Sequence, residues 1–182
     1  MTKTKLLSKD TILQAHVFDV VKVGVRLPDG RERSYDLVDH ADAVTILPMD
    51  AAGQVYFVSQ YRIGAEAELL EFPAGVMEKG EDALLSARRE LREEIGMDCQ
   101  DLRFLGGFYM AAGYSNEYMR CFLAQGLFKA PLEQDEDEFL SLSTKSLDET
   151  YAMVWNGQIE DSKTLAALLY AYPLLKEKLT TV

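Results

Sequence analysis

The 182-residue chain is poor in the residues from which disulfide scaffolds and His-rich metal centres are built. It has two cysteines, Cys99 and Cys121, and two histidines, His16 and His40. Two cysteines support neither a disulfide framework nor a zinc site, so we expect reduced thiols and a cytoplasmic location. No apolar run approaches the roughly 20 residues that span a bilayer, and the N-terminus lacks a signal-peptide core. We therefore expect no membrane partner.

Positive charge is also scarce. Lysine and arginine number 19 against 30 aspartates and glutamates, which gives a net charge of -11. A general nucleic-acid binder needs a basic surface to neutralise phosphates, so we expect no nucleic-acid partner. An acidic protein can still bind a small phosphorylated ligand when divalent metal ions mediate the contact. The apolar fraction of 48% is ample for a folded core.

The first half of the chain has the pattern of β-strands. Two Val-rich or alternating segments, 16–27 and 33–40, flank the turn residues Asp29 and Gly30, which predicts an antiparallel hairpin. We interpret residues 1–40 as a β-hairpin extension and 41–182 as the main domain. Further strands are expected at 43–49, 54–62, 68–75, 102–110 and 117–127.

A helical period replaces the strand pattern between Glu81 and Ile95, with Gly96 as the expected C-terminal cap. Two more helices are expected at 147–157 and 161–172, the second with Asp161 as its N-cap. Strands in one sheet with helices around it indicate an α+β fold, an αβα sandwich with a mixed β-sheet.

The segment "RRELREEIG" places three arginines and three glutamates in nine residues, 88–96. On a helix Glu90 and Glu94 share one face, with Glu93 beside them. One interpretation is a salt-bridged surface helix. The other is a cation site, because hard divalent ions take carboxylate and carbonyl oxygens and the Pro/Gly loop "FPAG" precedes the helix.

The spacing favours the second interpretation. Gly75, five residues, Glu81, seven residues and then "RELREEIGM" fill every fixed position of a pattern that resembles the Nudix box. The flanking segments are similar to the ADP-ribose and nucleoside diphosphate sugar pyrophosphatase branch of that superfamily. The resemblance implies a Nudix-type αβα sandwich and a Mg²⁺-dependent pyrophosphohydrolase, with Mn²⁺ as a substitute ion.

The resemblance also implies residue roles. The metal ligands fall on Glu90, Glu93, Glu94 and the backbone carbonyl of Ala74, while Arg89 pairs with Glu81. In the family that the chain resembles, the general base is a glutamate on a loop after the last strands. Here that loop is the acidic "EQDEDEF", with Glu138 as first choice and Glu136 as second.

Substrate contacts are expected at Arg62, Arg33, Glu71, Gly113 and Glu117, since a guanidinium suits phosphate oxygens and the carboxylates suit a ribose or a metal shell. In related dimers the N-terminal hairpin is exchanged. We therefore expect a homodimer in which Arg33, with an aromatic such as Phe18 or Tyr35, serves the partner's site.

One departure leaves the substrate open. ADP-ribose-preferring relatives carry Pro-Gly where this chain has Ala112 and Gly113, and Tyr114 follows. ADP-ribose is the leading nucleotide-sugar substrate, with GDP-mannose or other nucleotide sugars next. The alternatives are a dinucleoside-polyphosphate hydrolase, whose relatives place a tyrosine near Tyr114, and a non-catalytic Nudix-fold nucleotide-binding regulator.

Overall fold

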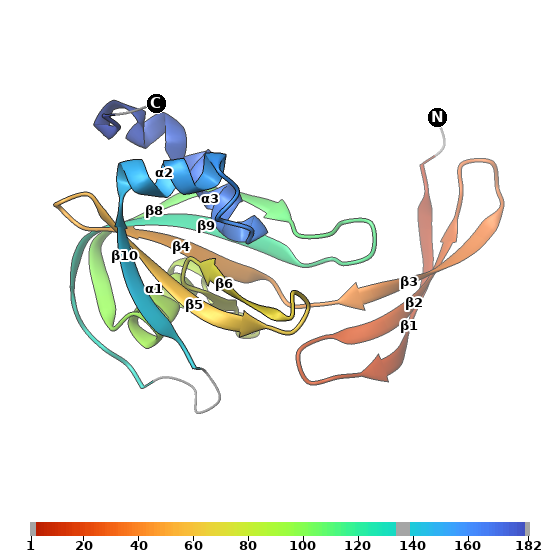
Figure 1. Cartoon of the computed structure of the whole chain (residues 1–182). Helices are drawn as coiled ribbons and strands as arrows, with labels where there is room; N and C mark the ends of the chain where they lie inside the picture. The colour runs from red at the N-terminus through yellow and green to blue at the C-terminus, as the bar shows by residue number, and fades with distance from the viewer. Residues whose placement is uncertain (1–2, 134–138, 181–182) are drawn as a thin grey trace. The chain divides into compact units, whose positions relative to one another are not determined.

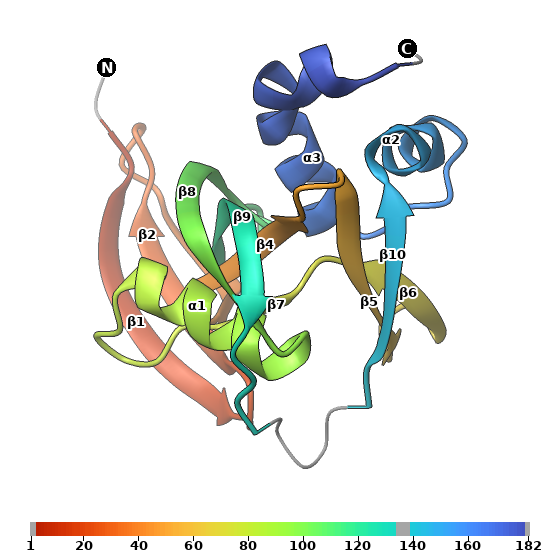
Figure 2. The ribbon, with the colours of Figure 1, turned by 90° about the vertical axis from the view of Figure 1, so that its left-hand side faces the viewer.

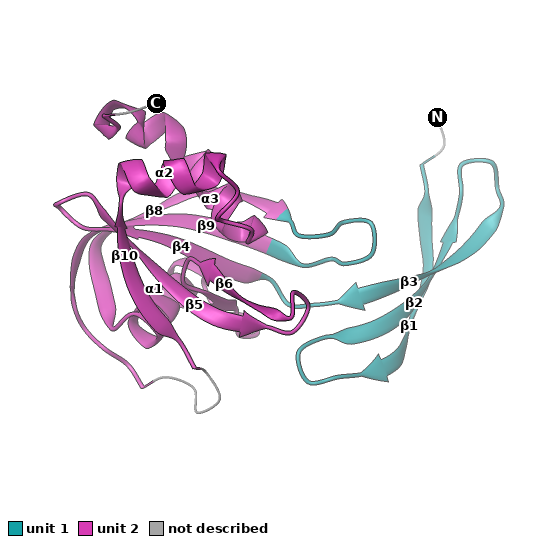
Figure 3. Cartoon of the chain, in the orientation of Figure 1, with its two compact units in different colours: residues 1–42, 109–118 teal, residues 43–108, 119–182 magenta. Residues whose placement is uncertain are grey.

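The computed structural model describes residues 3–133 and 139–180. The chain divides into two compact units, shown in different colours in Figure 3. One unit holds residues 1–42 and 109–118, and the other holds 43–108 and 119–182. The first unit thus contains the N-terminal extension expected from the sequence and, in addition, a loop from the middle of the chain.

The first unit is a three-stranded antiparallel sheet, β1 (Lys5–Gln14), β2 (Asp19–Arg26) and β3 (Glu32–Asp39), in that order. The expected hairpin is β2–β3, and its turn contains Gly30 at a φ of 88°. A left-handed residue of this kind favours glycine. Strand β1 was not expected from the sequence, and all ten of its residues are exposed.

The loop 109–118 is attached to the end of β3 by hydrogen bonds. The Val38 amide donates to the Tyr114 carbonyl at 2.7 Å. The Asn116 side chain donates to Asp39 Oδ1 at 2.6 Å and accepts from the His40 amide at 2.9 Å. Asp39 also pairs with Lys9 of β1 at 2.6 Å. The hydrogen bond from Lys9 is the main cause that lowers the pKa of Asp39.

The second unit is built on a seven-stranded mixed sheet with the order β10-β5-β4-β9-β8, to which β6 adds beside β5 and β7 beside β4. Strands β4 and β9 run parallel. The strands are β4 (Ala43–Met49), β5 (Gln54–Arg62), β6 (Ala67–Glu71), β7 (Ala74–Val76), β8 (Met97–Tyr109), β9 (Tyr118–Lys129) and β10 (Ser141–Ser146).

Helices cover both faces of this sheet, as Figures 1 and 2 show. Helix α1 (Ala83–Glu94) lies on one face, and α2 (Leu147–Trp155) and α3 (Ser162–Leu175) lie on the other. A short 3₁₀ turn, Lys176–Lys178, follows α3. The expected α+β sandwich with a mixed sheet is confirmed.

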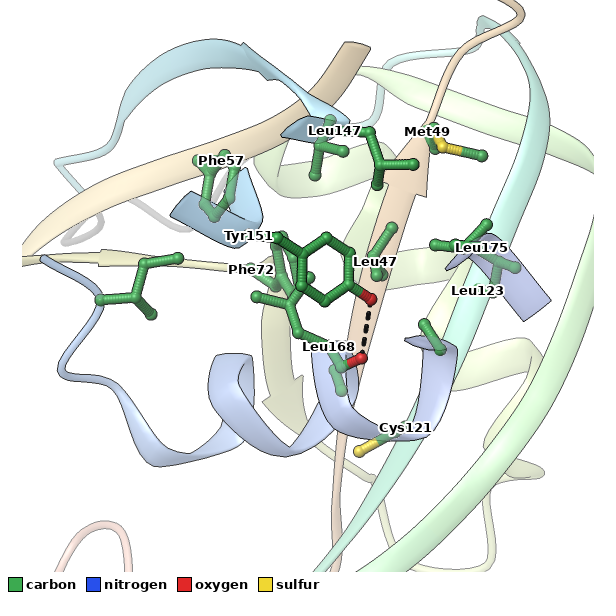
Figure 4. Close-up of a cluster of buried hydrophobic side chains, with 14 of the residues drawn as sticks. Leu47, Met49, Phe57, Phe72, Cys121, Leu123, Leu147, Tyr151, Leu168 and Leu175 are labelled. Carbon is green, nitrogen blue, oxygen red and sulfur yellow. Dashed lines mark hydrogen bonds between the residues drawn. The ribbon is translucent and has the colours of Figure 1, made fainter. Parts of the chain in front are cut away.

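Strand β4 runs through the centre of the sheet, and all seven of its residues are buried. Val44 and Ile46 belong to the core cluster beneath α1, which includes Leu91. Leu47 and Met49 belong to the other cluster, in which the Tyr151 hydroxyl of α2 donates to the Leu168 carbonyl of α3 at 2.9 Å (Figure 4). Because successive side chains on a strand point to opposite faces, one apolar run fills two cores.

Several elements differ from the sequence-based expectation, among them the expected strand 68–75, which is two strands, β6 and β7. Helix α1 begins at Ala83 because the Asp82 side chain accepts from the amides of Leu84 and Leu85 and so caps it. Strand β8 begins at Met97, directly after Gly96 at a φ of 70°. Strand β10 was not expected, since "SLSTKS" is polar and short. No helix within the described ranges is long and apolar enough to cross a membrane.

Candidate metal and catalytic site

Helix α1 turns two glutamates toward the protein interior. Its buried residues include Glu90 and Glu94, which are 6% and 4% exposed, and they lie one turn apart on the face that also carries Leu91. Burying a carboxylate is costly unless it is paired or binds a cation. A salt-bridged surface helix would keep such side chains in water, so the interpretation as a plain solvated helix is wrong for Glu90 and Glu94.

The loop before α1 lies directly against one of these carboxylates. Strand β7 pairs with β4, which places Ala74 opposite Thr45 and Gly75 opposite Val44. A Cβ atom on Gly75 would lie 2.1–2.3 Å from the carboxyl atoms of Glu90, far inside van der Waals contact. Only glycine allows this approach of the loop backbone to the Glu90 carboxylate.

Arg89 organises the acidic groups around it. Its Nε lies 3.1 Å from Glu81 Oε1, and its Nη1 lies 2.6 Å from Glu90 Oε1 and 2.9 Å from Glu93 Oε2. The hydrogen bond with Glu81 is the main cause that raises the pKa of Arg89, and the same bond lowers the pKa of Glu81. The expected Arg89–Glu81 pair is confirmed. Glu81 also accepts from the Glu78 amide at 2.9 Å, which holds the loop.

The donor set fits a hard divalent cation, because it consists of carboxylates and a loop carbonyl. In the part of the chain that the structure describes, no three Asp, Glu, His or Cys side chains gather into a ready metal cluster. Glu90 and Glu93 each accept a hydrogen bond from Arg89 through one carboxylate oxygen. The ligand set Ala74, Glu90, Glu93 and Glu94 therefore stays a prediction.

An open cleft lies beside the C-terminal end of α1. The residues that line it come from the end of the helix, the segment after β9 and strand β10, and they are Glu93, Glu94, Ile95, Gly96, Pro131, Leu132 and Leu142. Arg92 holds one wall, because its Nε donates to the Ala130 carbonyl at 2.8 Å. The cleft gives a small ligand access to two of the proposed metal ligands.

Arg62 and Glu71 form a bidentate ion pair between β5 and β6. Arg62 Nε and Nη2 lie 2.7 and 2.6 Å from the two carboxylate oxygens. The Arg62 side chain is 40% exposed, whereas that of Glu71 is 1% exposed. Burial alone would raise the pKa of Glu71, but its hydrogen bonds with Arg62 and Lys163 outweigh burial and lower it. Arg62 is thus an anchored, solvent-facing guanidinium.

The other expected substrate contacts, Arg33, Gly113 and Glu117, belong to the first unit. Arg33 is exposed on β3, and its Nη1 donates to the Glu32 carbonyl at 2.9 Å. Gly113 has open space around it, and the Glu117 amide donates to Ser115 Oγ at 3.1 Å. Their roles toward a substrate stay predictions.

The two candidate bases, Glu136 and Glu138, lie outside the described residues. Their segment lies between β9 and β10 along the chain. The expectation that it follows the last strands is therefore wrong, because the polar sequence of β10 concealed a further strand.

Sequence reasoning missed Lys163, which is 6% exposed and lies at the start of α3. Its Nζ contacts Glu71 at 2.5 Å and Asp161 at 3.0 Å. Asp161 was expected as an N-cap, and this is confirmed because its carboxylate accepts from the Thr164 amide at 2.9 Å. A lysine within the first turn of a helix, where cations are disfavoured, was the available signal.

The fold and this glutamate site define a hydrolase of the Nudix class. The chain belongs to the family described as NUDIX domain, whose model matches residues 39–168. The expected family and enzyme class are confirmed.

Relatives match along nearly the whole chain. A methanol dehydrogenase activator from Bacillus methanolicus is 36% identical over 91% of this chain and 94% of its own. An ADP-ribose pyrophosphatase from Bacillus subtilis (strain 168) is 34% identical over 96% of this chain and 95% of its own. A crystal structure of an ADP compounds hydrolase superposes with a TM-score of 0.86 at 28% identity, covering 98% of this chain and 97% of that one.

Proposed function

We propose that this Nudix hydrolase cleaves the pyrophosphate bond of nucleoside diphosphate sugars and releases a nucleoside monophosphate and a sugar phosphate. ADP-ribose is the leading substrate. The observation that carries the proposal is the pair of buried carboxylates, Glu90 and Glu94, with the Gly75 backbone against one of them. The names of the B. subtilis relative and of the similar crystal structure support a substrate of this chemical class.

Mg²⁺, with Mn²⁺ as a substitute, would be held by Glu90, Glu93, Glu94 and the Ala74 carbonyl. When bound, the ion would neutralise charge on the phosphates and lower the pKa of the water molecule that it binds. Arg89 neutralises part of the acidic cluster and fixes the rotamers of its neighbours. Glu138, or else Glu136, accepts the proton from the attacking water.

The proposed substrate contacts include cationic and acidic side chains. Arg62 binds a phosphate oxygen, because it is partly exposed and a guanidinium matches phosphate geometry. Arg33, Gly113 and Glu117 contact the nucleotide or sugar. Glu71 contributes to the same contact, and its buried position makes it act through Arg62.

A substrate panel tests the proposal. ADP-ribose, GDP-mannose, diadenosine polyphosphates and nucleoside triphosphates are incubated with enzyme and Mg²⁺, and the products are identified. We expect AMP and ribose phosphate from ADP-ribose. No turnover of any nucleotide sugar would overturn the proposal.

Glu94→Gln tests the metal assignment. We expect Mg²⁺-dependent kcat to fall on the order of 100-fold or more, since even outer-shell partners of a metal change activity by about 10–100-fold. Circular dichroism should show an intact fold. Near-normal turnover by this variant would remove Glu94 from the metal site.

A second candidate is hydrolysis of dinucleoside polyphosphates. Tyr114 is 63% exposed in the loop 109–118, so its ring is available to stack on a second base. The same substrate panel separates the two activities, because a dinucleoside substrate yields two nucleotides and no sugar phosphate.

We also propose a cytoplasmic homodimer. The exposed strand β1, in which Leu6 and Ile12 are 60% and 54% exposed, supports an interface with a second copy. Both cysteines are free and buried, which fits a reducing compartment.

A further inference from the structure

Four charged side chains form a network at the start of α3. Glu71 accepts from Arg62 Nε at 2.7 Å, from Arg62 Nη2 at 2.6 Å and from Lys163 Nζ at 2.5 Å. Lys163 Nζ also lies 3.0 Å from Asp161 Oδ1. The network links the neighbouring strands β5 and β6 to α3, and its Glu71–Lys163 contact joins positions 92 residues apart.

The network is fixed at its buried end. The second carboxylate oxygen of Asp161 accepts from the Thr164 amide at 2.9 Å and from the Thr164 hydroxyl at 2.6 Å. The Thr164 hydroxyl oxygen in turn accepts from the Phe72 amide at 2.8 Å. Glu71, Asp161, Lys163 and Thr164 are all less than a tenth exposed. Each buried charge therefore has a partner of defined geometry.

Arg62 is the one member that reaches solvent. Its Nε and Nη2 bind Glu71, and its side chain is 40% exposed. The pKa of Arg62 is raised, chiefly by the hydrogen bond with Glu71, with smaller contributions from the charges of Asp161 and Glu94.

Lys163 is the buried cation that makes this arrangement neutral. Without Lys163, the two buried carboxylates of Glu71 and Asp161 would be balanced by the single positive charge of Arg62. A paired and hydrogen-bonded ion network gives little net stability compared with apolar packing, so its value lies in fixing a geometry. Here the geometry that it fixes is the plane of the Arg62 guanidinium, which the bidentate bond to Glu71 sets.

We infer that Lys163 is a positioning residue that, through Glu71, orients Arg62 to bind a pyrophosphate oxygen. The inference rests on the proposed function. Lys163 does not touch the substrate. Its contribution is made before binding, because an arginine already held in one orientation loses less conformational freedom when an anion arrives.

The test compares Lys163→Met, Arg62→Ala and the double variant in ADP-ribose hydrolysis. We expect Lys163→Met to raise KM by about ten-fold and to change kcat less. A ten-fold change corresponds to the weakening of one charge-assisted hydrogen bond between Arg62 and the substrate. In the Arg62→Ala background, Lys163→Met should leave KM unchanged, because its effect passes through Arg62. An equal rise in KM in both backgrounds would overturn the inference.

A control separates positioning from stability. Tyr151→Phe removes the buried hydrogen bond to Leu168 on the same face of the sheet. It should lower Tm and leave KM unchanged.

Lys163→Gln, which keeps a hydrogen-bond donor, is used in place of Lys163→Met if the methionine variant does not fold. It should raise KM less than Arg62→Ala does. A KM equal to that of the wild type in both Lys163 variants also overturns the inference.

Binding of inorganic pyrophosphate with Mg²⁺, measured by calorimetry, keeps the two proposals apart. If the wild type hydrolyses no nucleotide sugar but Arg62→Ala and Lys163→Met both weaken pyrophosphate binding, the proposed substrate is wrong and the positioning role holds. If neither variant weakens it, the positioning role of Lys163 is wrong, whatever the enzyme hydrolyses.

Discussion

At the scale of single residues, the site depends on close contact between loop backbone and helix side chain. Gly75 and Glu90 come from different elements, and they lie so close that a Cβ atom at position 75 would clash with the Glu90 carboxylate. The sequence predicted both residues through their fixed spacing. It could not reveal that Glu71 is buried and shared by Arg62 and Lys163, because that contact joins positions 92 residues apart.

Gly75→Ala should damage the site specifically. The new methyl group would lie 2.1 Å from the Glu90 carboxyl carbon, so the loop or the carboxylate must move. We expect Mg²⁺-dependent turnover to fall steeply and unfolding free energy to fall by about 1–3 kcal/mol, as for other overpacked positions. Gly64→Ala is the matched control, because a Cβ there meets no atom within 4 Å. Equal activity in both variants would contradict this view of the loop.

The two thiols should be inert in the folded protein. Burial raises the pKa of Cys99 to about 11 and that of Cys121 to about 12, from 9.0. Because the folded pKa values are raised above 9.0, the two buried neutral thiols contribute their full stability below pH 9. This contribution is lost as pH rises through about 11 for Cys99 and about 12 for Cys121. We expect no reaction with a thiol reagent at pH 8 until denaturant is added, when two groups react. Fast labelling of the native protein would contradict the burial.

At the scale of elements, two strands of the large sheet were predicted to the residue. Strands β4 and β5 were expected at 43–49 and 54–62 and occupy those ranges. Strands β1 and β10 were missed, because their residues are largely exposed or polar and carry no apolar period. Pairing with a neighbouring strand forms them, and pairing is not visible in a local pattern.

Asp82→Ala tests how α1 begins. The Asp82 carboxylate accepts from the Leu84 amide at 2.9 Å, so its loss leaves helix amides without a partner. We expect the free energy of unfolding to fall by about 1 kcal/mol, the usual cost of an N-cap. Thermal unfolding measures the change, and Asp82→Asn should retain most of the stability. If the alanine variant were as stable as the wild type, the cap would not hold the helix.

At the scale of the whole molecule, the N-terminal sheet presents an exposed strand at its edge. All ten residues of β1 are exposed, and Ile12 and Leu13 are 54% and 56% exposed. Strand β1 favours association, since its exposed leucine and isoleucine side chains offer apolar surface and it forms an edge of the sheet.

Ile12→Asp should therefore weaken a homodimer without unfolding the protomer. The side chain is more than half exposed, so its replacement removes little from the core of one chain. Light scattering coupled to gel filtration should give a dimer for the wild type and a shift towards monomer for the variant. Leu169→Asp is the matched control, because Leu169 is an equally apolar residue, 73% exposed on α3, and should leave the dimer intact. A strictly monomeric wild type would contradict the dimer and would remove Arg33 from the site.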